Sequence, residues 1–374
     1  MRKSKLHGLA DHGQSVWIDY LSRKLIRKGE LERMMREDAV VGVTSNPTIF
    51  QKAIAEGDAY DEQLAEIFEE EADAKEIFLQ LAARDVQDAC DLLRPVWDEG
   101  KGQDGYVSME VDPTLAYDRE GTYAETKRFH EWIDRPNLLV KIPATDPGLR
   151  AIEDSIAAGY PINITLIFSL ERHREVVEAY LRGLERLVAA GGDPTTVASV
   201  ASFFVSRVDS EADKRLEAIG SEEALALRGK LAIANAKLAY EHFEQAFSGE
   251  RWEYLASKGA SRQRCLWAST STKNAQYRDV LYVEELIGPL TVNTMPQETM
   301  QAYQDHGEVA LTLTQGREDA RQVFADLERV GVDYDDVTDL LEEEGVQKFA
   351  DSFKELLDGV RVKRGDLATR QAEA

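Results

Sequence analysis

The chain has few residues that bind metals or form disulfides. Its 374 residues include two cysteines, Cys90 and Cys265, which are far apart and not in a metal-ligating spacing. This pattern gives no disulfide framework and fits a protein of the reducing cytoplasm. The six histidines are scattered without an H-E-x-x-H pair, so we expect no metal and no cofactor.

Basic residues and long apolar runs are also scarce. The chain has 45 Lys and Arg against 69 Asp and Glu, a formal net charge of −24. This excess argues against nucleic-acid or anionic-membrane partners. No apolar run approaches the ~20 residues that span a bilayer, and MRKSKLHGLADHG lacks the apolar core of a signal peptide. An anionic substrate would therefore need a local cluster of donors.

Apolar, β-branched segments alternate with helical patterns along the chain. Most are apolar on both faces until their last residues, which is typical of parallel strands covered by helices. An open doubly wound sheet would usually carry a Gly-rich loop after its first strand, and none is found. Eight βα units predict one α/β domain over residues 1–374, a (β/α)8 or TIM barrel with extra helices. The predicted strands are 15–21, 40–46, 106–111, 137–143, 161–168, 197–206, 263–270 and 291–296.

Helical patterns fill the intervals between the predicted strands. Asp146, which precedes a proline, is the predicted N-cap of one helix, and Ser169 of another. The gaps 51–105 and 207–262 are each long enough for more than one helix. The segment 317–374 is helical and strongly acidic, and we predict that it is a C-terminal extension packing on the barrel.

Polar side chains stand near the C-terminal end of seven predicted strands, where barrel enzymes carry their catalytic groups. Together they would form a polar ring inside an apolar barrel, which is unfavourable unless its members are hydrogen-bonded or used. The candidate residues are Asp19, Asn46, Glu110, Lys141, Asn163, Thr165, Ser202, Arg207, Ser269 and Lys273.

Single members of this ring also have purely structural explanations. For any one of them alone, the structural explanation is the favoured one. The alternatives are a helix cap for Asp19, a turn at Asn46, an ion pair of Glu110 with Lys141, and an ion pair of Arg207 with Asp209 or Glu211.

Lys141 ends the otherwise apolar run NLLVKIP and is the most informative of these residues. Desolvation disfavours the ammonium form, so a buried Lys141 would be an amine able to add to a carbonyl. The resulting iminium is an electron sink that lets a neighbouring carbon–carbon bond break. Glu110 and Asp19 are candidates for moving the protons. A phosphate could be held by Arg207, Ser269 and Lys273.

Six motifs in order resemble those of the transaldolase family and extend from Val43 to Asn274: VTSNPT, SMEVD, LLVKIPAT, PINITLIFS, ASFFVSRVD and LWASTSTKN. The continuation VLYVEELIGPLTVNTMP is similar to the larger bacterial branch of that family. The resemblance implies a transferase of the pentose phosphate pathway that needs no metal. It would move a dihydroxyacetone unit from sedoheptulose 7-phosphate to glyceraldehyde 3-phosphate, giving erythrose 4-phosphate and fructose 6-phosphate.

The resemblance also implies a role for each candidate residue. Lys141 would be the Schiff-base nucleophile, Glu110 an acid/base acting through a water that Thr165 helps to hold, and Asp19 the acceptor of the proton from the carbon-4 hydroxyl. The remaining roles are hydroxyl binding by Asn46, Asn163 and Ser202, and phosphate binding by Arg207 and Ser269.

The chain departs from the family pattern at one position of the seventh-strand motif. Many members carry an arginine where this chain has Ser271, and the nearest cation here is Lys273. A lysine supplies charge to a phosphate but no bidentate fork. The resemblance therefore leaves open whether Lys273 replaces that arginine.

Two other interpretations of the motifs stay open. A fructose-6-phosphate aldolase of similar fold would be shorter and would carry a glutamine or similar residue in place of Glu110. A non-catalytic barrel that binds sugar phosphates would be expected to lack Asp19, Glu110 or Lys141, and all three are present.

The oligomeric state is also open, with a homodimer as one possibility. The helical tail could cover the barrel mouth and protect the enamine from water.

Overall fold

Eight parallel strands close into a barrel in the computed structural model, which describes residues 4–55, 58–68 and 73–373. Neighbours in the chain are neighbours in the barrel, and β8 pairs with β1 to close it. The predicted (β/α)8 barrel and all eight predicted strands are confirmed. The strands are β1 (Gln14–Ile18), β2 (Val40–Val43), β3 (Tyr106–Glu110), β4 (Leu138–Pro143), β5 (Ile162–Ile167), β6 (Ser199–Phe204), β7 (Arg264–Ala268) and β8 (Thr291–Met295).

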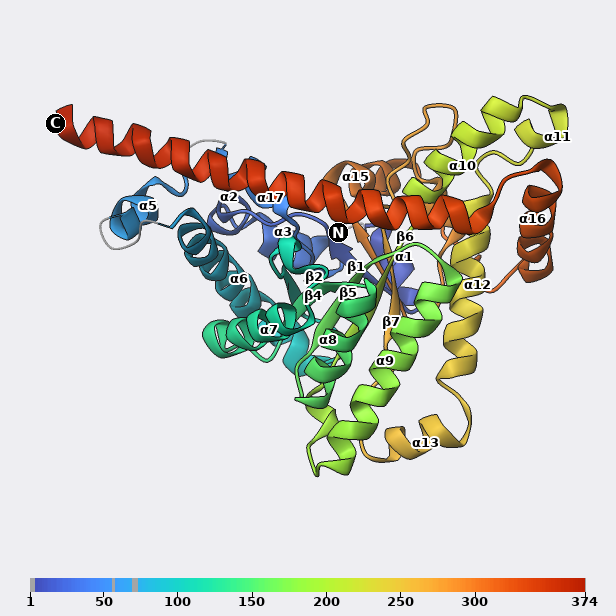
Figure 1. Ribbon diagram of the computed structural model, residues 1–374, viewed down its shortest axis with the longest axis horizontal. Helices are drawn as coiled ribbons and strands as arrows, with labels where there is room; N and C mark the ends of the chain where they lie inside the picture. The colour runs from blue at the N-terminus through green and yellow to red at the C-terminus, as the bar shows by residue number, and fades with distance from the viewer. Residues whose placement is uncertain (1–3, 56–57, 69–72, 374) are drawn as a thin grey trace.

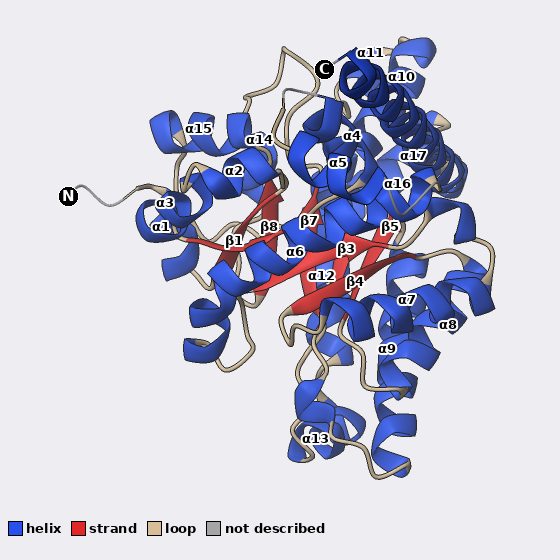
Figure 2. Ribbon diagram, turned by 90° about the vertical axis from the view of Figure 1, so that its left-hand side faces the viewer, coloured by secondary structure: helices blue, strands red, loops and turns tan. Residues whose placement is uncertain are grey.

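Helices surround the barrel, which lies at the centre of the molecule (Figure 2). Both long gaps between predicted strands hold several helices, as expected. The helices are α1 (Leu6–Asp11), α2 (Arg23–Arg27), α3 (Glu30–Glu37), α4 (Pro47–Ala55), α5 (Asp61–Phe68), α6 (Ala74–Glu99), α7 (Arg119–Ile133), α8 (Asp146–Ala157), α9 (Leu170–Ala189), α10 (Ser206–Ile219), α11 (Glu222–Leu225), α12 (Leu231–Ala246), α13 (Gly249–Ser257), α14 (Leu281–Glu285), α15 (Gln297–His306), α16 (Arg317–Val330) and α17 (Tyr334–Glu373), with 3-10 turns η1 (Pro113–Leu115) and η2 (Pro194–Thr196).

The two predicted helix caps have different outcomes. Ser169 caps α9, because its hydroxyl accepts a hydrogen bond from the Arg172 amide at 3.0 Å. The prediction of Asp146 as the cap of α8 is wrong by one residue. Thr145 has the extended backbone of a cap, and its hydroxyl accepts from the Gly148 amide at 3.1 Å. Asp146 is instead the first helical residue, where a negative charge favours the helix N-terminus.

Strand register brings three polar side chains to one level inside the barrel. Glu110 on β3 is the register partner of Lys141 on β4, which in turn pairs with Asn163 on β5. Register partners on neighbouring strands point to the same face of a sheet. The barrel therefore places these side chains next to one another.

The predicted acidic tail folds into α16 and α17 (Figure 1). The 40-residue helix α17 runs across the molecule and packs against α4, α6, α10 and β5. Close packing is visible at Gly345, where an added Cβ would come within 3.1 Å of Leu166 on β5. Phe353 meets Phe78 of α6 edge to face, with ring centroids 5.8 Å apart. The tail thus lies over the C-terminal end of the barrel.

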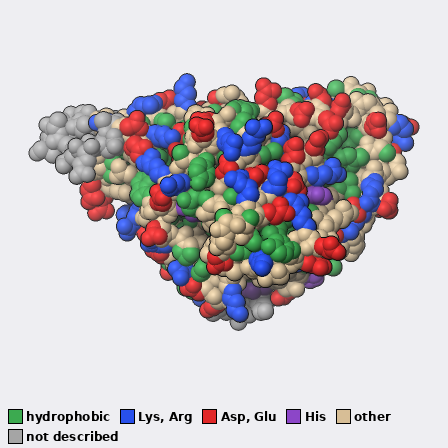
Figure 3. Space-filling view, turned by 60° about the horizontal axis from the view of Figure 1, so that its bottom comes forward, with side chains coloured by type: hydrophobic (Ala, Val, Ile, Leu, Met, Phe, Trp, Pro, Cys, Tyr) green, Lys and Arg blue, Asp and Glu red, His purple; other side chains and the backbone are tan. Residues whose placement is uncertain are grey.

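Acidic and basic side chains are interspersed on the face shown in Figure 3. Many charged side chains of the protein pair, as Arg251 does with Glu178 at 2.7 Å and with Glu185 at 2.6 Å. Within the described ranges, no helix combines the length and apolar character that crossing a membrane requires.

Candidate active site

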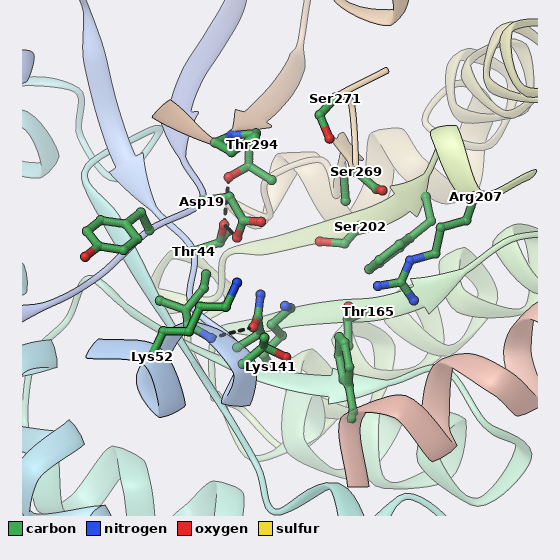
Figure 4. A pocket seen from close by; sticks show the side chains of 18 of the residues that line it. Asp19, Thr44, Lys52, Lys141, Thr165, Ser202, Arg207, Ser269, Ser271 and Thr294 are labelled. Atoms are coloured by element: carbon green, nitrogen blue, oxygen red, sulfur yellow. Dashed lines mark hydrogen bonds between the residues drawn. The ribbon is translucent and has the colours of Figure 1, made fainter. Parts of the chain in front are cut away.

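A cavity of about 460 Å³ lies at the C-terminal end of the strands, where α17 contributes Phe349 to its wall (Figure 4). Eight of the ten predicted site residues line it. These are Asp19, Asn46, Lys141, Thr165, Ser202, Arg207, Ser269 and Lys273. The other two, Glu110 and Asn163, flank Lys141 on the neighbouring strands.

Lys141 is almost completely buried, with 5% of its surface exposed. Its amino group donates a hydrogen bond to the Ser45 carbonyl at 3.3 Å and lies 3.5 Å from the Glu110 carboxylate. The ring centroid of Phe349 is 5.7 Å away. The predicted ion pair with Glu110 is therefore present, and it lies at the wall of a cavity large enough for a small ligand.

Glu110 has a strongly perturbed carboxyl group. Burial raises its pKa to about 7, and the attraction of Lys141 offsets only part of that effect. Its buried Oε2 atom lies 3.5 Å from the Lys141 amine but, like the buried hydroxyl oxygen of Thr165, accepts no hydrogen bond of good geometry from any described residue. Two such oxygens near a cavity are where an ordered water or a ligand hydroxyl is expected.

The backbone of β5 is distorted next to Thr165. The register of β5 with β6 shifts between Ile164 and Ile167, and Leu166 has a φ of 60°. A residue other than glycine rarely adopts this left-handed conformation. Bulges of this kind re-aim side chains near active sites, and here Thr165 lines the cavity.

Asp19 is a carboxyl group that lines the cavity itself. It accepts a hydrogen bond from the Thr44 hydroxyl at 2.7 Å, and Thr44 in turn lies 2.7 Å from Thr294 Oγ1. Burial raises the pKa of Asp19, while the positive charge of Lys141 and the bond from Thr44 act in the opposite direction. The helix-cap alternative for Asp19 is wrong, because the Ser22 hydroxyl caps α2.

Asn46 directly precedes α4. The alternative that it only forms a turn does not describe its whole role, because its side chain also caps the helix and lines the cavity. Its side-chain oxygen accepts a hydrogen bond from the Ile49 amide at 3.0 Å. This bond uses only the oxygen, and the side-chain nitrogen remains available to a ligand in the cavity that Asn46 lines.

Asn163 does not line the cavity and is fully buried. Its side-chain oxygen accepts from the Ser202 hydroxyl at 2.7 Å, and its nitrogen donates to Ser108 at 2.9 Å. Asn163 therefore orients Ser202, which does face the cavity.

Arg207 lies in the first turn of α10, with its guanidinium 5.1 Å from the centre of the Phe204 ring. The alternative ion pairs are wrong, because Asp209 is bonded to Tyr282 and Glu211 pairs with Arg215. Across the described ranges, Arg207 has no carboxylate within ion-pair distance. A half-buried guanidinium without an anionic partner fits a ligand phosphate or carboxylate.

The segment after β7 brings further donors to the Arg207 side. Ser269 has a φ of 56°, and its hydroxyl lies 2.9 Å from that of Ser206 at the start of α10. The Lys273 ammonium donates to the Ser271 hydroxyl at 2.7 Å. Its charge therefore lies next to Ser271, the residue that stands where the family pattern has an arginine.

Lys52 and Phe349 are among the cavity-lining residues that the sequence did not predict. Lys52 on α4 extends toward the cavity from the side opposite Arg207 (Figure 4). Lys52 comes six residues after Asn46, on the helix that follows the C-terminal end of β2. This position in the sequence is the signal that could have identified it. Phe349 has no local signal, because it reaches the cavity only through the long-range packing of α17.

The fold and the site define a barrel enzyme whose buried lysine lies beside one carboxyl group and shares its cavity with another. Comparison with known proteins narrows this class. Residues 16–360 match the family model described as transaldolase/fructose-6-phosphate aldolase. The chain belongs to this family.

Curated relatives match over nearly the whole chain. A transaldolase of Parafrankia sp. (strain EAN1pec) is 53% identical over 97% of this chain and 99% of its own length. The transaldolase of Frankia alni is 52% identical, covering 97% and 98% of the two chains, and that of Mycobacterium ulcerans is 51% identical, covering 98% and 99%. The predictions of the family and of a transaldolase-type transferase are confirmed.

Proposed function

We propose that this protein moves a dihydroxyacetone unit between sugar phosphates through a Schiff base on Lys141. One observation supports this above all others. The Lys141 amine lies 3.5 Å from Glu110 in a cavity that Asp19 also lines, and burial raises the pKa of both carboxyls. A nucleophile beside two proton carriers is what carbonyl addition and carbon–carbon cleavage require.

Loading begins when the Lys141 nitrogen adds to the ketone carbon of fructose 6-phosphate or sedoheptulose 7-phosphate. Glu110 in its acid form then protonates the carbinolamine hydroxyl through a water held between its Oε2 atom and the Thr165 hydroxyl. The hydroxyl leaves as water and an iminium forms. The two buried oxygens without hydrogen-bond partners support this placement of the water.

Cleavage uses Asp19 as the base. It takes the proton of the carbon-4 hydroxyl, the bond between carbons 3 and 4 breaks, and its electron pair moves into the iminium to give an enamine. The aldehyde product leaves. An acceptor aldehyde reverses these steps, and Asp19 returns its proton to the new hydroxyl. The bond from Thr44 supports this role, because it fixes the carboxyl beside the reacting carbons.

The polar residues of the cavity divide between the two ends of the substrate. Asn46 and Ser202 bind hydroxyls of the dihydroxyacetone unit, and Asn163 holds Ser202 in place. The phosphate binds on the opposite side, where the Arg207 guanidinium, which has no ion-pair partner among the described residues, supplies a fork. The phosphate donors are Arg207, Ser269 and Lys273.

The setting of the reaction follows from its chemistry. We infer that it takes place in the cytoplasm, where phosphorylated sugars are retained because their charge prevents them from crossing membranes. A homodimer is one possible assembly and a monomer is the alternative. Sedimentation velocity of the full chain distinguishes the two.

Product analysis separates this function from the alternatives. With fructose 6-phosphate and erythrose 4-phosphate, we expect sedoheptulose 7-phosphate and glyceraldehyde 3-phosphate. With fructose 6-phosphate alone, we expect no steady release of dihydroxyacetone. Steady release of dihydroxyacetone would show a fructose-6-phosphate aldolase. No product from fructose 6-phosphate, with or without erythrose 4-phosphate, would show a non-catalytic barrel.

A further inference from the structure

Helix α10 carries two buried carboxyls in addition to Arg207. Asp209 and Asp213 are one helical turn apart and only 1% and 7% exposed. Neither has an ion-pair partner within 4 Å in the described part of the chain. Buried carboxylates without a counter-ion are unfavourable unless hydrogen bonds hold them, so their bonding partners matter.

Each carboxylate uses one oxygen for a tyrosine hydroxyl and the other for a backbone amide. Both tyrosines belong to the stretch that follows β7. The four hydrogen bonds are Tyr277 to Asp213 at 2.5 Å, the Gly229 amide to Asp213 at 2.8 Å, Tyr282 to Asp209 at 2.8 Å, and the Ala232 amide to Asp209 at 2.8 Å.

The tyrosines anchor the segment 269–280, which links β7 to α14. At its start, the Ser206 amide donates to the Ser269 carbonyl at 3.0 Å. Near its end, Tyr277 is tied to Asp213, and just beyond it α14 is tied to Asp209 through Tyr282. The segment that carries Lys273 is thus fastened at both ends to the helix that carries Arg207.

Open space lies beside this segment. A second cavity of about 220 Å³ is lined by Asp213, Tyr277 and Tyr282, and Lys273 lines both this cavity and the active site. The segment therefore lies between two spaces, with open space on its side away from the active site. The tyrosine hydroxyls provide the restraint on that side.

We propose that Asp209 and Asp213 are positioning residues that, through Tyr282 and Tyr277, hold Ser269 and Lys273 against Arg207. They set the preference of the enzyme for phosphorylated over unphosphorylated substrates. This inference rests on the proposed function, in which those donors bind the substrate phosphate. Neither carboxyl touches the reacting atoms.

The test is Tyr277→Phe, which keeps the ring and removes the hydroxyl. We expect KM for fructose 6-phosphate to rise about tenfold, the loss typical of one hydrogen bond to a charged acceptor. We expect kcat to change less than twofold, and kcat/KM for unphosphorylated fructose to stay the same. Tyr282→Phe should give the same signature, and it serves as the second variant if Tyr277→Phe does not fold.

Tyr180→Phe is the matched control. This buried tyrosine also donates to an oxygen, the Ser261 carbonyl at 2.7 Å, but it lies on α9 and does not line the active-site cavity. It should leave the ratio of phosphorylated to unphosphorylated kcat/KM unchanged. A Tyr277→Phe variant with an unchanged ratio, or with equal losses for both substrates, would overturn the positioning role.

Borohydride trapping of the wild-type protein separates this inference from the proposed function. If fructose 6-phosphate leaves no adduct on Lys141, the proposed function fails. If the adduct forms but the ratio of phosphorylated to unphosphorylated kcat/KM is the same in Tyr277→Phe as in the wild type, only the positioning role fails.

Discussion

At the scale of single residues, two carboxyls of the site, one lining the cavity and one beside Lys141, have a raised pKa for the same reason. Glu110 and Asp19 are both removed from water, and Lys141 only partly compensates. Ordinary carboxyls would be fully ionised at neutral pH and would be poor acids. Burial instead brings Glu110 close to the pH at which it can both donate and accept a proton.

Glu110→Gln should lower kcat by a factor of roughly 10² to 10⁴, because general acid–base catalysis is lost. The limb of the pH–rate profile with a pKa near 7 should disappear, because that is the value to which burial raises the Glu110 pKa. Exposed Glu37 provides the control, since Glu37→Gln should leave the profile unchanged. A variant that keeps the limb near pH 7 would show that another group produces it.

The same substitution should change the pH dependence of stability. The pKa of Glu110 is about 7 when folded against 4.5 for a free side chain, so the folded state binds more protons between these values. Stability from this group is therefore lost as pH rises from 4.5 to 7, by as much as about 3 kcal/mol. Urea unfolding should show that the free energy of unfolding of Glu110→Gln, relative to that of the wild type, is higher at pH 8 than at pH 5. A constant difference would contradict the burial account.

At the scale of elements, α17 brings a side chain of the C-terminal extension into the wall of the active-site cavity. Phe349 lines the cavity 5.7 Å from the Lys141 amine, whereas Phe353, one turn later, packs on Phe78 instead. An enamine exposed to water is protonated and hydrolysed, which turns a transferase into an aldolase. We therefore propose that the helix protects the intermediate as well as covering apolar surface.

Phe349→Ala should release dihydroxyacetone from fructose 6-phosphate several-fold faster than the wild type, because water reaches the enamine. Phe353→Ala is the matched control. Both remove a buried ring from α17, at about 3 kcal/mol or more of stability, but only Phe349 lines the active-site cavity. Equal release from both variants, measured with an enzymatic assay for dihydroxyacetone, would mean that loosening the helix is responsible.

The elements that the sequence predicts correctly are those with a local signal. Apolar runs marked the strands, and polar side chains at their C-terminal ends marked the site, because parallel strands in a barrel end on one face. The cap of α8 was misassigned because Thr145 and Asp146 are both cap formers. Only the folded chain, where the Thr145 hydroxyl also bonds the Ala116 carbonyl, selects between them. Phe349 and the pair of Asp213 with Tyr277 depend on contacts between distant segments.

At the scale of the whole molecule, α17 connects parts of the chain that are far apart. It packs on α4 and α6 from the first third, on β5 and on α10, while β8 closes the barrel on β1. We therefore propose that residues 1–374 form one domain that includes the helical extension 317–374.

One domain should unfold in one transition. All five tryptophans precede the extension 317–374, and Trp17 and Trp267 are fully buried in the barrel. Tryptophan fluorescence therefore reports melting of the barrel and its surrounding helices, while circular dichroism at 222 nm reports all helices, the extension included. We expect the two signals to share one Tm within error. Loss of part of the helical signal at a lower temperature would show that the tail melts separately.

The central claim is that Lys141 forms the covalent link to the sugar. The direct measurement is borohydride reduction of the protein with fructose 6-phosphate, followed by mass analysis of its peptides. The account predicts a dihydroxyacetone adduct on Lys141 and on no other lysine, including Lys52 and Lys273 in the same cavity. An adduct on another lysine, or turnover retained in Lys141→Arg, would contradict it.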